Sequence, residues 1–212
     1  MFNLCGEEIM TTQLVNMFPI VASKSEGCLT EEEFSTLFTR IHELFDECDL
    51  DMVQTTGDFH KEPAAKPLVD FILSQGIREY VFSHGILMNK FKITNMWVNR
   101  YKKTISIHNH IHSNSLISGV FYLDDHGGTI VSNPLGHISN IVMAENTMPS
   151  SGNSDQFISK SAANSMFIFP SWLYHTSIPN PSDEYRFTIA FNVVSENLGQ
   201  DVRFNRLELS KE

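Results

Sequence analysis

The chain changes its pattern of hydrophobic and polar positions near residue 90. Before this point the spacing predicts helices. Thr30 stands at an N-cap position with Glu33 three residues later, which is the capping-box arrangement. Apolar residues then follow three and four positions apart, as on one face of a helix: Phe34, Leu37, Phe38, Ile41, Leu44 and Phe45. A second helix is predicted after Pro67, with Gly76 as the place where it bends or ends.

After residue 90 the pattern becomes typical of β-strands. Six short runs are rich in β-branched and aromatic residues and are separated by Gly, Pro, Asn, Asp and Ser. They are residues 91–99, 103–112, 115–123, 128–133, 165–170 and 186–194. Such strands, joined mostly by turns, predict an antiparallel sandwich or barrel. The polar segment 134–164 predicts long loops with one weak strand over 137–143.

The domain organisation follows from the length and from this division. A chain of 212 residues buries a full core, and no repeat or linker calls for a second unit. The sequence therefore predicts a single domain, 1–212, in which residues 1–90 form a helical buttress. Residues 91–194 form the β core, and residues 195–212 form a C-terminal tail.

The charge and the cysteines exclude several classes. With 15 Lys+Arg against 25 Asp+Glu, the net charge of −10 makes nucleic acid an unlikely partner, and we interpret the basic run 99–103 as a solvated strand end. No apolar run approaches the roughly 20 residues that cross a bilayer. No secretory signal is visible. Three widely spaced cysteines predict free thiols, which favours a cytoplasmic protein.

Three histidines two residues apart give the first candidate chemistry. His108, His110 and His112 would point to the same face of a strand. Imidazole is a good ligand for iron, zinc, copper and nickel, and a third ligand from another strand would complete a site. The alternative is that these histidines are ordinary solvated or hydrogen-bonded groups, which is the usual role of a single histidine in a strand.

The second candidate lies downstream. An apolar strand, a Pro-Ser turn and Trp172 lead directly into His175. Eleven residues later, Arg186 and Thr188 share one face of a strand whose other face is apolar. An arginine is costly to bury unless it meets an anion, and its planar fork matches a carboxylate. The alternative is an arginine at the strand end paired with Asp183 or Glu184.

The order of these pieces resembles the iron(II)- and 2-oxoglutarate-dependent oxygenases. The resemblance is to the small bacterial and phage group related to the prolyl-hydroxylase-like branch. Four segments carry it, and together they fall within residues 90–194: 110–123, 127–130, 169–175 and 186–192. Each segment is weak alone, but the ordered set is specific. It implies a mainly β fold with N-terminal helices, namely a double-stranded β-helix (jelly-roll, cupin-like).

The resemblance also implies the site. Fe(II) would be held by His110, His112 and His175, and the far carboxylate of 2-oxoglutarate would be bound by Arg186 with help from Thr188. Tyr122 would add a hydroxyl to that carboxylate. Asn99 and Tyr101 are candidates for the near side of the cosubstrate. His108 paired with His110 is the alternative ligand pair, and Asp124 or Asp125 in place of His112 is not expected.

One position departs from most of the superfamily, which has Asp or Glu where this chain has His112. The change removes a negative charge from around the metal before the dianionic cosubstrate binds. The predicted enzyme is a dioxygenase that uses O2 to hydroxylate a small-molecule or peptide substrate of unknown identity, with no oligomeric state implied. The alternatives are a cupin-like three-histidine module or sensor without oxygenase activity, and a β-sandwich with structural histidines. Segment 134–164 and the helices are expected to border the substrate entrance, and Trp97 and Trp172 to lie in the core.

Overall fold

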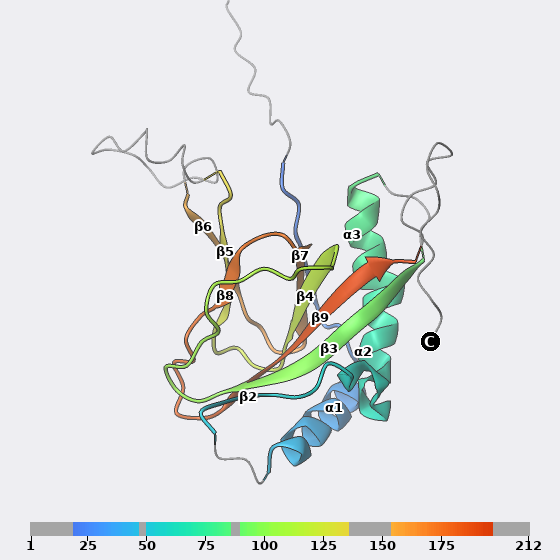
Figure 1. The fold of residues 1–212 in the computed structure, drawn as a ribbon. Helices are drawn as coiled ribbons and strands as arrows, with labels where there is room; N and C mark the ends of the chain where they lie inside the picture. Colours follow the sequence, from blue (N-terminus) through green and yellow to red (C-terminus); the bar gives the residue numbers. More distant parts are fainter. Residues whose placement is uncertain (1–18, 47–49, 86–89, 136–153, 197–212) are drawn as a thin grey trace, which may run out of the picture.

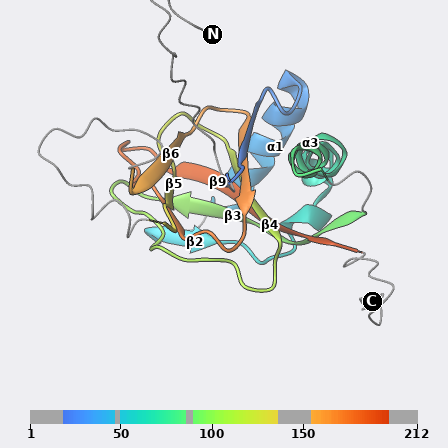
Figure 2. The ribbon, with the colours of Figure 1, turned by 90° about the horizontal axis from the view of Figure 1, so that it is seen from above.

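The computed structural model describes residues 19–46, 50–85, 90–135 and 154–196. These residues form two antiparallel sheets, and helices cover the outer face of the larger one (Figures 1 and 2). The six-stranded sheet has the order β1-β7-β4-β9-β3-β2, and the three-stranded sheet has the order β6-β5-β8. The predicted class, mainly β with N-terminal helices, is confirmed.

In the described residues, every helix precedes the long strand β3. The strands are β1 (Ser23–Glu26), β2 (Met52–Gln54), β3 (Phe91–Tyr101), β4 (Ile117–Tyr122), β5 (Gly128–Ser132), β6 (Gln156–Lys160), β7 (Ser165–Pro170), β8 (His175–Ser177) and β9 (Arg186–Ser195). The helices are α1 (Glu31–Leu44), the 3-10 turns η1 (Phe59–Lys61) and η2 (Pro63–Ala65), α2 (Lys66–Phe71), the π-helical turn η3 (Ile72–Gly76) and α3 (Ile77–Ser83).

Helix α1 begins as the sequence predicts. The side chain of Thr30 accepts a hydrogen bond from the main-chain N–H of Glu33, and the Glu33 carboxylate accepts one from the main-chain N–H of Thr30. This capping box satisfies two N–H groups that a helix start leaves unpaired. Leu37 and Ile41, on the apolar face, are completely buried against the larger sheet.

Helices α2 and α3 are joined through η3 and lie against β7. Gly76, where the sequence predicts a bend or an end, closes this π-helical turn. A Cβ at Gly76 would lie 2.5 Å from Cε of Met166, so glycine lets the helix approach the sheet closely. The predicted end at Gly76 is wrong, because this residue has right-handed helical angles and the helix continues to Ser83.

The central strands separate two kinds of side chain. On β4 and β9, Phe121, Ile189 and Phe191 face the helices and join the main apolar core. The alternate positions, among them Tyr122 and Thr188, line a pocket between the two sheets. The sheet thus carries the apolar core on one face and candidate chemistry on the other.

Besides the three-residue strand β8, three short strands were not predicted. β1 and β2 lie in the part of the chain that the sequence predicts as helical, and they pair with β7 and β3. β6 lies within the segment 134–164 that the sequence predicts as loops, apart from its weak strand. All three are short, and β1 (Ser-Lys-Ser-Glu) has no apolar alternation, so their pairing depends on distant partners. The weak strand predicted at 137–143 lies outside the described residues, as does the predicted tail beyond residue 196.

The predicted strand 103–112 is wrong as a regular element. Thr104 has a positive φ of 66°, and the segment follows residues 171–180 through scattered contacts. Side chains replace main-chain partners in places, as where Ser177 Oγ accepts from the N–H of Ile107. Only at His110 does a bridge form, to His175. This bridge is enough to bring the histidine segment against β8.

The prediction of a solvated strand end at residues 99–103 is wrong for its first three residues. Asn99, Arg100 and Tyr101 are each no more than 3% exposed. The Arg100 guanidinium donates to the main-chain carbonyls of Phe45 and Leu50, at and beyond the end of α1. Its positive charge therefore stabilises the carbonyl groups at the C-terminal end of α1, and Arg100 is not part of a charged surface cluster.

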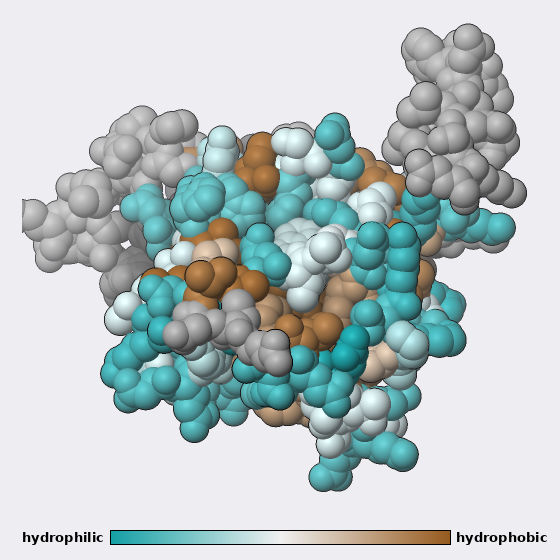
Figure 3. Space-filling view, turned by 60° about the horizontal axis from the view of Figure 1, so that its bottom comes forward, coloured by the Kyte–Doolittle hydropathy of each residue, from teal (hydrophilic) through white to brown (hydrophobic). Residues whose placement is uncertain are grey.

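The surface is mainly hydrophilic, with apolar side chains gathered in places on the face that Figure 3 shows. No helix in the described part of the chain is long and apolar enough to span a membrane.

Candidate metal centre

Three histidines meet between the two sheets. His110 and His112 come from the segment between β3 and β4, and His175 is the first residue of β8. Their candidate ligand atoms all lie within 4.8 Å of one another, and Nε2 of His112 lies 3.2 Å from Nε2 of His175. Ligands bound to one ion at about 2.1 Å lie roughly 3 Å apart, so small side-chain shifts would bring all three onto a metal.

The bridge between His110 and His175 explains why two of them converge. Each residue donates its main-chain N–H to the carbonyl of the other, at 3.0 and 2.9 Å. Directly paired residues of antiparallel strands project their side chains to the same face. The ring centroids of His110 and His175 accordingly lie 4.4 Å apart, and His112 follows two residues after His110.

Hydrogen bonds to the rear nitrogens orient the rings. Nδ1 of His110 lies 2.8 Å from the carbonyl oxygen of His108, and Nδ1 of His175 lies 2.8 Å from that of Leu173. Each carbonyl can accept only from an N–H, which fixes the proton on Nδ1 and leaves Nε2 of both rings with a lone pair. That lone pair is the group a metal requires.

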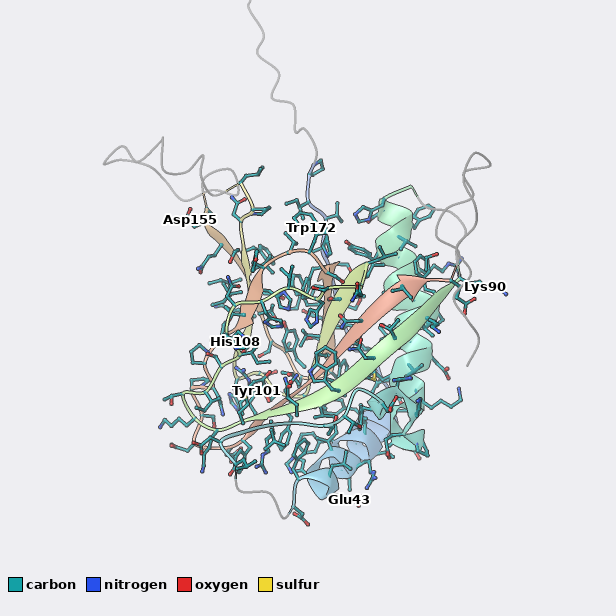
Figure 4. All side chains as sticks on the ribbon, viewed as in Figure 1. Glu43, Lys90, Tyr101, His108, Asp155 and Trp172 are labelled. Carbon is teal, nitrogen blue, oxygen red and sulfur yellow. The ribbon has the colours of Figure 1, made fainter. Side chains whose placement is uncertain are left out.

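Aromatic side chains enclose the histidines. Phe169 meets the His175 ring edge-on at 4.7 Å, and Trp97 lies 5.5 Å from the His112 ring. The expectation that both tryptophans lie in the core is wrong for Trp172, which is 54% exposed and labelled in Figure 4. Trp97 is half-buried beside the site, with its indole N–H donating to Asn99 Oδ1.

Burial keeps two of the histidines neutral. It lowers the pKa of His112 to about 4, with a smaller contribution from the charge of His110. Burial likewise lowers the pKa of His175 to about 4. Both imidazoles are therefore unprotonated at neutral pH, which is the state that binds metals.

These pKa values predict how the stability of the metal-free protein depends on pH. Below about pH 6.5 the unfolded chain binds protons at His112 and His175 that the folded chain does not bind. Their contribution is complete above pH 6.5 and is lost as the pH falls toward 4, at up to roughly 1.4 kcal/mol per pH unit for each histidine. Urea unfolding midpoints of chelator-treated protein at pH 7, 6 and 5 measure this slope. It should flatten in His112→Gln but persist in His126→Gln, which changes an exposed histidine; an equal slope in both variants would contradict the assignment.

The other candidate ligands lie apart from the cluster. His108 is exposed, with its ring 6.0 Å from that of His110, and it does not belong to the three-histidine group. The carboxylate of Asp124 accepts hydrogen bonds from the main-chain N–H groups of His126 and Phe187. Asp125 accepts from the N–H of Ala163. Both carboxylates thus serve turns.

Arg186 is buried against Tyr101, a residue that lines the pocket between the two sheets. It is 2% exposed, and its guanidinium carbon lies 4.5 Å from the centre of the Tyr101 ring. Nη1 donates to the main-chain carbonyls of Ile178 and His126, whereas Nε and Nη2 are buried without a hydrogen-bond partner. Among the described residues Arg186 forms no ion pair, and Asp183 pairs with Lys103. A buried cation with two unused donor nitrogens is suited to an anion.

The pocket joins two of the histidines to Tyr101, the side chain against which Arg186 packs. It encloses about 390 Å³, counted with the solvent at its mouth, and both His110 and His175 line it. Its remaining walls come from both sheets: Asn99, Tyr101, Ile107, Val120, Tyr122, Gly128, Thr129, Thr176, Ser177, Thr188 and Ala190. Figure 4 shows Tyr101 at the end of β3 nearest the three-stranded sheet. Four predicted residues, Asn99, Tyr101, Tyr122 and Thr188, therefore share one pocket.

Hydroxyl groups also line this pocket. The phenol of Tyr122 lies 2.7 Å from Thr129 Oγ1, and burial raises the pKa of Tyr122 to about 12. The phenol therefore keeps its proton at neutral pH. Asn99 donates from Nδ2 to Thr188 Oγ1 at 3.2 Å, while its Oδ1 accepts from Gln54. These groups can donate to an oxygen-rich ligand.

Sequence reasoning missed a buried polar group behind His112. It consists of Asn192 on β9, Ser118 on β4, and Ser171 after β7, each no more than 4% exposed. Asn192 and Ser171 stand inside the segments 186–192 and 169–175 that carried the family resemblance, but no role was predicted for them. The available signal was their polarity within otherwise apolar runs.

Comparisons with known proteins agree with this geometry. The model of the family described as "Putative 2OG-Fe(II) oxygenase" matches residues 95–192. The matched segment includes all three clustered histidines, Arg186 and Asn192. No curated protein matches the chain.

Solved structures show the fold. The non-heme alpha ketoglutarate dependent carbocyclase SnoK from nogalamycin biosynthesis aligns with TM-score 0.62 and 12% identity, over 91% of this chain and 90% of SnoK. HygX from Streptomyces hygroscopicus, with nickel and 2-oxoglutarate bound, aligns with TM-score 0.58 and 11% identity, over 82% of each chain. The viral collagen prolyl hydroxylase vCPH from Paramecium Bursaria Chlorella virus-1, in its 2OG complex, aligns with TM-score 0.53 and 15% identity, over 81% of this chain and 94% of vCPH. The fold is thus the double-stranded β-helix that the sequence predicts.

Proposed function

Because the model of the 2OG-Fe(II) oxygenase family matches residues 95–192, we propose that the chain hydroxylates a substrate with Fe(II) held by His110, His112 and His175. Arg186 then binds the far carboxylate of 2-oxoglutarate. The observation that carries this proposal is the position of Arg186, whose two unpartnered nitrogens are buried beside a pocket that reaches the histidines. When bound, Fe(II) and 2-oxoglutarate supply the oxidising chemistry, in which O2 is consumed and the cosubstrate is decarboxylated to succinate.

The three histidine donors fit an iron ion that also binds an anionic cosubstrate. Three neutral imidazoles leave the full charge of a divalent ion in place, and 2-oxoglutarate brings two negative charges. The charge of Arg186 stabilises the far carboxylate at the other end of the pocket. Tyr122 and Thr188 supply hydroxyl groups at that end, and Asn99, with a second amide hydrogen beyond the one it gives Thr188, supplies a donor nearer the metal.

Enclosure of the site is the second task of the chain. His175 and Arg186 are buried, and Phe169 and Trp97 lie against two of the histidine rings. Removing water from around an oxidising centre limits unproductive reactions. We assign this role to the aromatic walls between the sheets.

The substrate enters, in this proposal, beside the ligand residues. Ile111 lies between two of the ligands, and Trp172 and Tyr174 come shortly before His175; these three side chains are 39%, 54% and 54% exposed. Apolar groups exposed next to a polar site commonly contact a ligand. They favour a small molecule or peptide with apolar surface as the substrate, and nucleic acid remains disfavoured by the charge of −10.

A cupin-like metal-binding module is the alternative. It needs the three histidines but gives no reason for an arginine without an ion-pair partner buried beside the same pocket, which is why we favour the oxygenase. We also propose that residues 1–212 form one domain and that the protein works in the cytoplasm. The domain proposal is supported by β1 and β2, which join the early part of the chain to the β core. The cytoplasmic proposal is supported by the buried thiol of Cys28, which is free.

The test of the proposed function is an anaerobic titration. Protein loaded with Fe(II) is titrated with 2-oxoglutarate, and the weak visible charge-transfer band of the bound cosubstrate is followed. We expect a saturable band in the wild type and none in Arg186→Ala at the same concentrations. Absence of the band in the wild type, or an unchanged band in the variant, would reject the oxygenase in favour of the metal-binding module.

Gly127 gives a further prediction, because it leaves room for the guanidinium. Its φ is +144°, and a Cβ there would lie 2.2 Å from Nη1 of Arg186. We expect Gly127→Ala to displace Arg186 and to raise the KM for 2-oxoglutarate by roughly ten- to a hundredfold, since small misplacements of binding groups are costly. Steady-state succinate formation measures the change. Gly85→Ala is the matched control, because Gly85 also has a positive φ but no neighbour within 4 Å of its Cβ position; an equal rise in both variants would contradict the steric explanation.

A further inference from the structure

We propose that Asn192 is a positioning residue that selects the tautomer of His112, and so sets the affinity of the metal site, by reversing a buried chain of hydrogen bonds. This inference rests on the proposed function, because it requires His112 to be a metal ligand. It concerns a residue outside the ligand and cosubstrate sets assigned above.

Asn192 lies directly behind His112. Its side chain projects from β9 and is 4% exposed. Nδ2 lies 3.3 Å from Nδ1 of His112, and Oδ1 accepts a hydrogen bond from Ser118 Oγ at 2.7 Å. The amide therefore connects a ligand ring on one side to a buried hydroxyl on the other.

The chain of hydrogen bonds continues away from the metal site. Ser118 Oγ lies 2.8 Å from Ser171 Oγ. In the present arrangement Ser118 donates to Asn192, and Ser171 donates to Ser115 Oγ at 3.0 Å. Ser115 Oγ donates to the main-chain carbonyl of Ile117 at 3.0 Å. The chain thus ends on a main-chain acceptor, and its middle links are hydroxyl groups that can turn.

In the arrangement found here, the histidines bond to each other. Because the amide N–H of Asn192 points at Nδ1 of His112, the ring carries its proton on Nε2. That N–H points at Nε2 of His175, 3.2 Å away, which has a lone pair because Nδ1 of His175 donates to Leu173. Two candidate ligand atoms thus satisfy each other, and this arrangement suits the metal-free protein.

Metal binding requires the opposite tautomer of His112. Nε2 must present a lone pair, so one proton leaves Nε2 and one is taken up on Nδ1, with no change in the charge of the ring. The new N–H needs an acceptor, and rotation of the Asn192 amide by 180° supplies its oxygen. The amide NH2 then donates to Ser118 Oγ, which donates to Ser171, and Ser171 donates to Ser115. Nδ1 of His112 and the hydroxyls of Ser118 and Ser171 each keep a partner, so the switch leaves none of these three groups unsatisfied.

An amide suits this task because it is neutral and has one donor end and one acceptor end. Leucine of similar size would leave His112 Nδ1 and Ser118 without the partner. Aspartate would accept from Nδ1–H permanently and so favour the metal-binding tautomer, but it would add a negative charge behind the site. The difference between the three side chains gives the proposal a direct test.

The experiment measures Co(II) binding to the metal-free full-length protein, by anaerobic titration that follows the visible d–d bands. We expect Asn192→Leu to raise the Kd for Co(II) by about 10- to 100-fold and to change the band positions, which is the usual cost of losing an outer hydrogen bond to a ligand. Asn192→Asp is expected to bind Co(II) at least as tightly as the wild type. A wild-type Kd in the leucine variant, or weakened binding in the aspartate variant, would overturn the proposal.

Controls separate positioning from general damage. Val193 follows Asn192 on β9 but is buried in the apolar core on the other face, so Val193→Ala should lower the unfolding midpoint without moving the Kd or the bands. If Val193→Ala weakens Co(II) binding as much as Asn192→Leu does, the positioning role is rejected. A wild type that binds no Co(II), or a His175→Ala variant that binds it normally, would overturn the proposed function and this inference with it. Should Asn192→Leu fail to fold, the comparison of aspartate with wild type decides.

Discussion

Replacing His175 with alanine is expected to lower Fe(II) affinity by more than about a hundredfold and to abolish succinate formation. Loss of a hydrogen bond to a ligand already costs roughly 10- to 100-fold, so loss of a ligand atom should exceed it. His175 is the most buried of the three histidines, and its main chain also holds His110 in place. Because the alanine variant keeps that main-chain bridge, the effect reports the lost imidazole. Competition with a coloured chelator under anaerobic conditions measures the affinity.

His108→Ala is the matched control for this prediction. It removes an exposed imidazole close to the cluster and keeps the main-chain carbonyl that accepts from His110. Iron affinity should stay within about twofold of the wild type, since surface substitutions away from specific interactions usually have small effects. Loss of iron binding in His108→Ala, with tight binding kept in His112→Ala, would show that the alternative ligand pair, His108 with His110, is the correct one.

Replacing Arg186 with leucine is expected to raise the KM for 2-oxoglutarate by about 30-fold or more while leaving Fe(II) affinity close to that of the wild type. Breaking a buried charge pair typically costs about 2–5 kcal/mol, and 1.4 kcal/mol is a factor of ten. The KM of Arg186→Lys should lie between those of the wild type and the leucine variant, because lysine keeps the charge but loses the planar fork. Succinate formation at varied cosubstrate concentration measures KM, and the chelator competition measures iron.

The separation of the two readouts makes the Arg186 prediction specific. A variant that merely unfolds would lose metal and cosubstrate together, and its unfolding midpoint would fall. A leucine variant with normal cosubstrate KM would show that the unpartnered nitrogens of Arg186 have another purpose. Such a result would favour the metal-binding module, which does not need an anion at this end of the pocket.

The sequence predicts two members of the histidine cluster because their spacing is a local property. His110 and His112 are two residues apart, and this alternation keeps both on one face even though the segment is not a regular strand. His175 could be linked to them only through the ordered resemblance to known oxygenases. The bridge that joins it to His110 spans 65 residues and leaves no local pattern.

The unpredicted parts depend on distant partners. β1 is four polar and charged residues long, and it exists because the exposed edge of β7 pairs with it. In the sequence, Asn192 is a single polar residue near the end of a mostly apolar strand. Its contact with His112 is across 80 residues, and its second contact, with Ser118, is across 74. No periodicity in the sequence marks such a contact.

The two faces of the larger sheet divide the work of the protein. Most apolar burial lies between this sheet and the helices, whereas the pocket lies on the opposite face and has a much smaller apolar cluster beside it. Exchanging pocket residues therefore removes little of the burial that keeps the chain folded. Substitutions in the pocket can therefore change the substrate range, in natural evolution or in the laboratory. The stability that comes from the core on the helix side allows the protein to tolerate them.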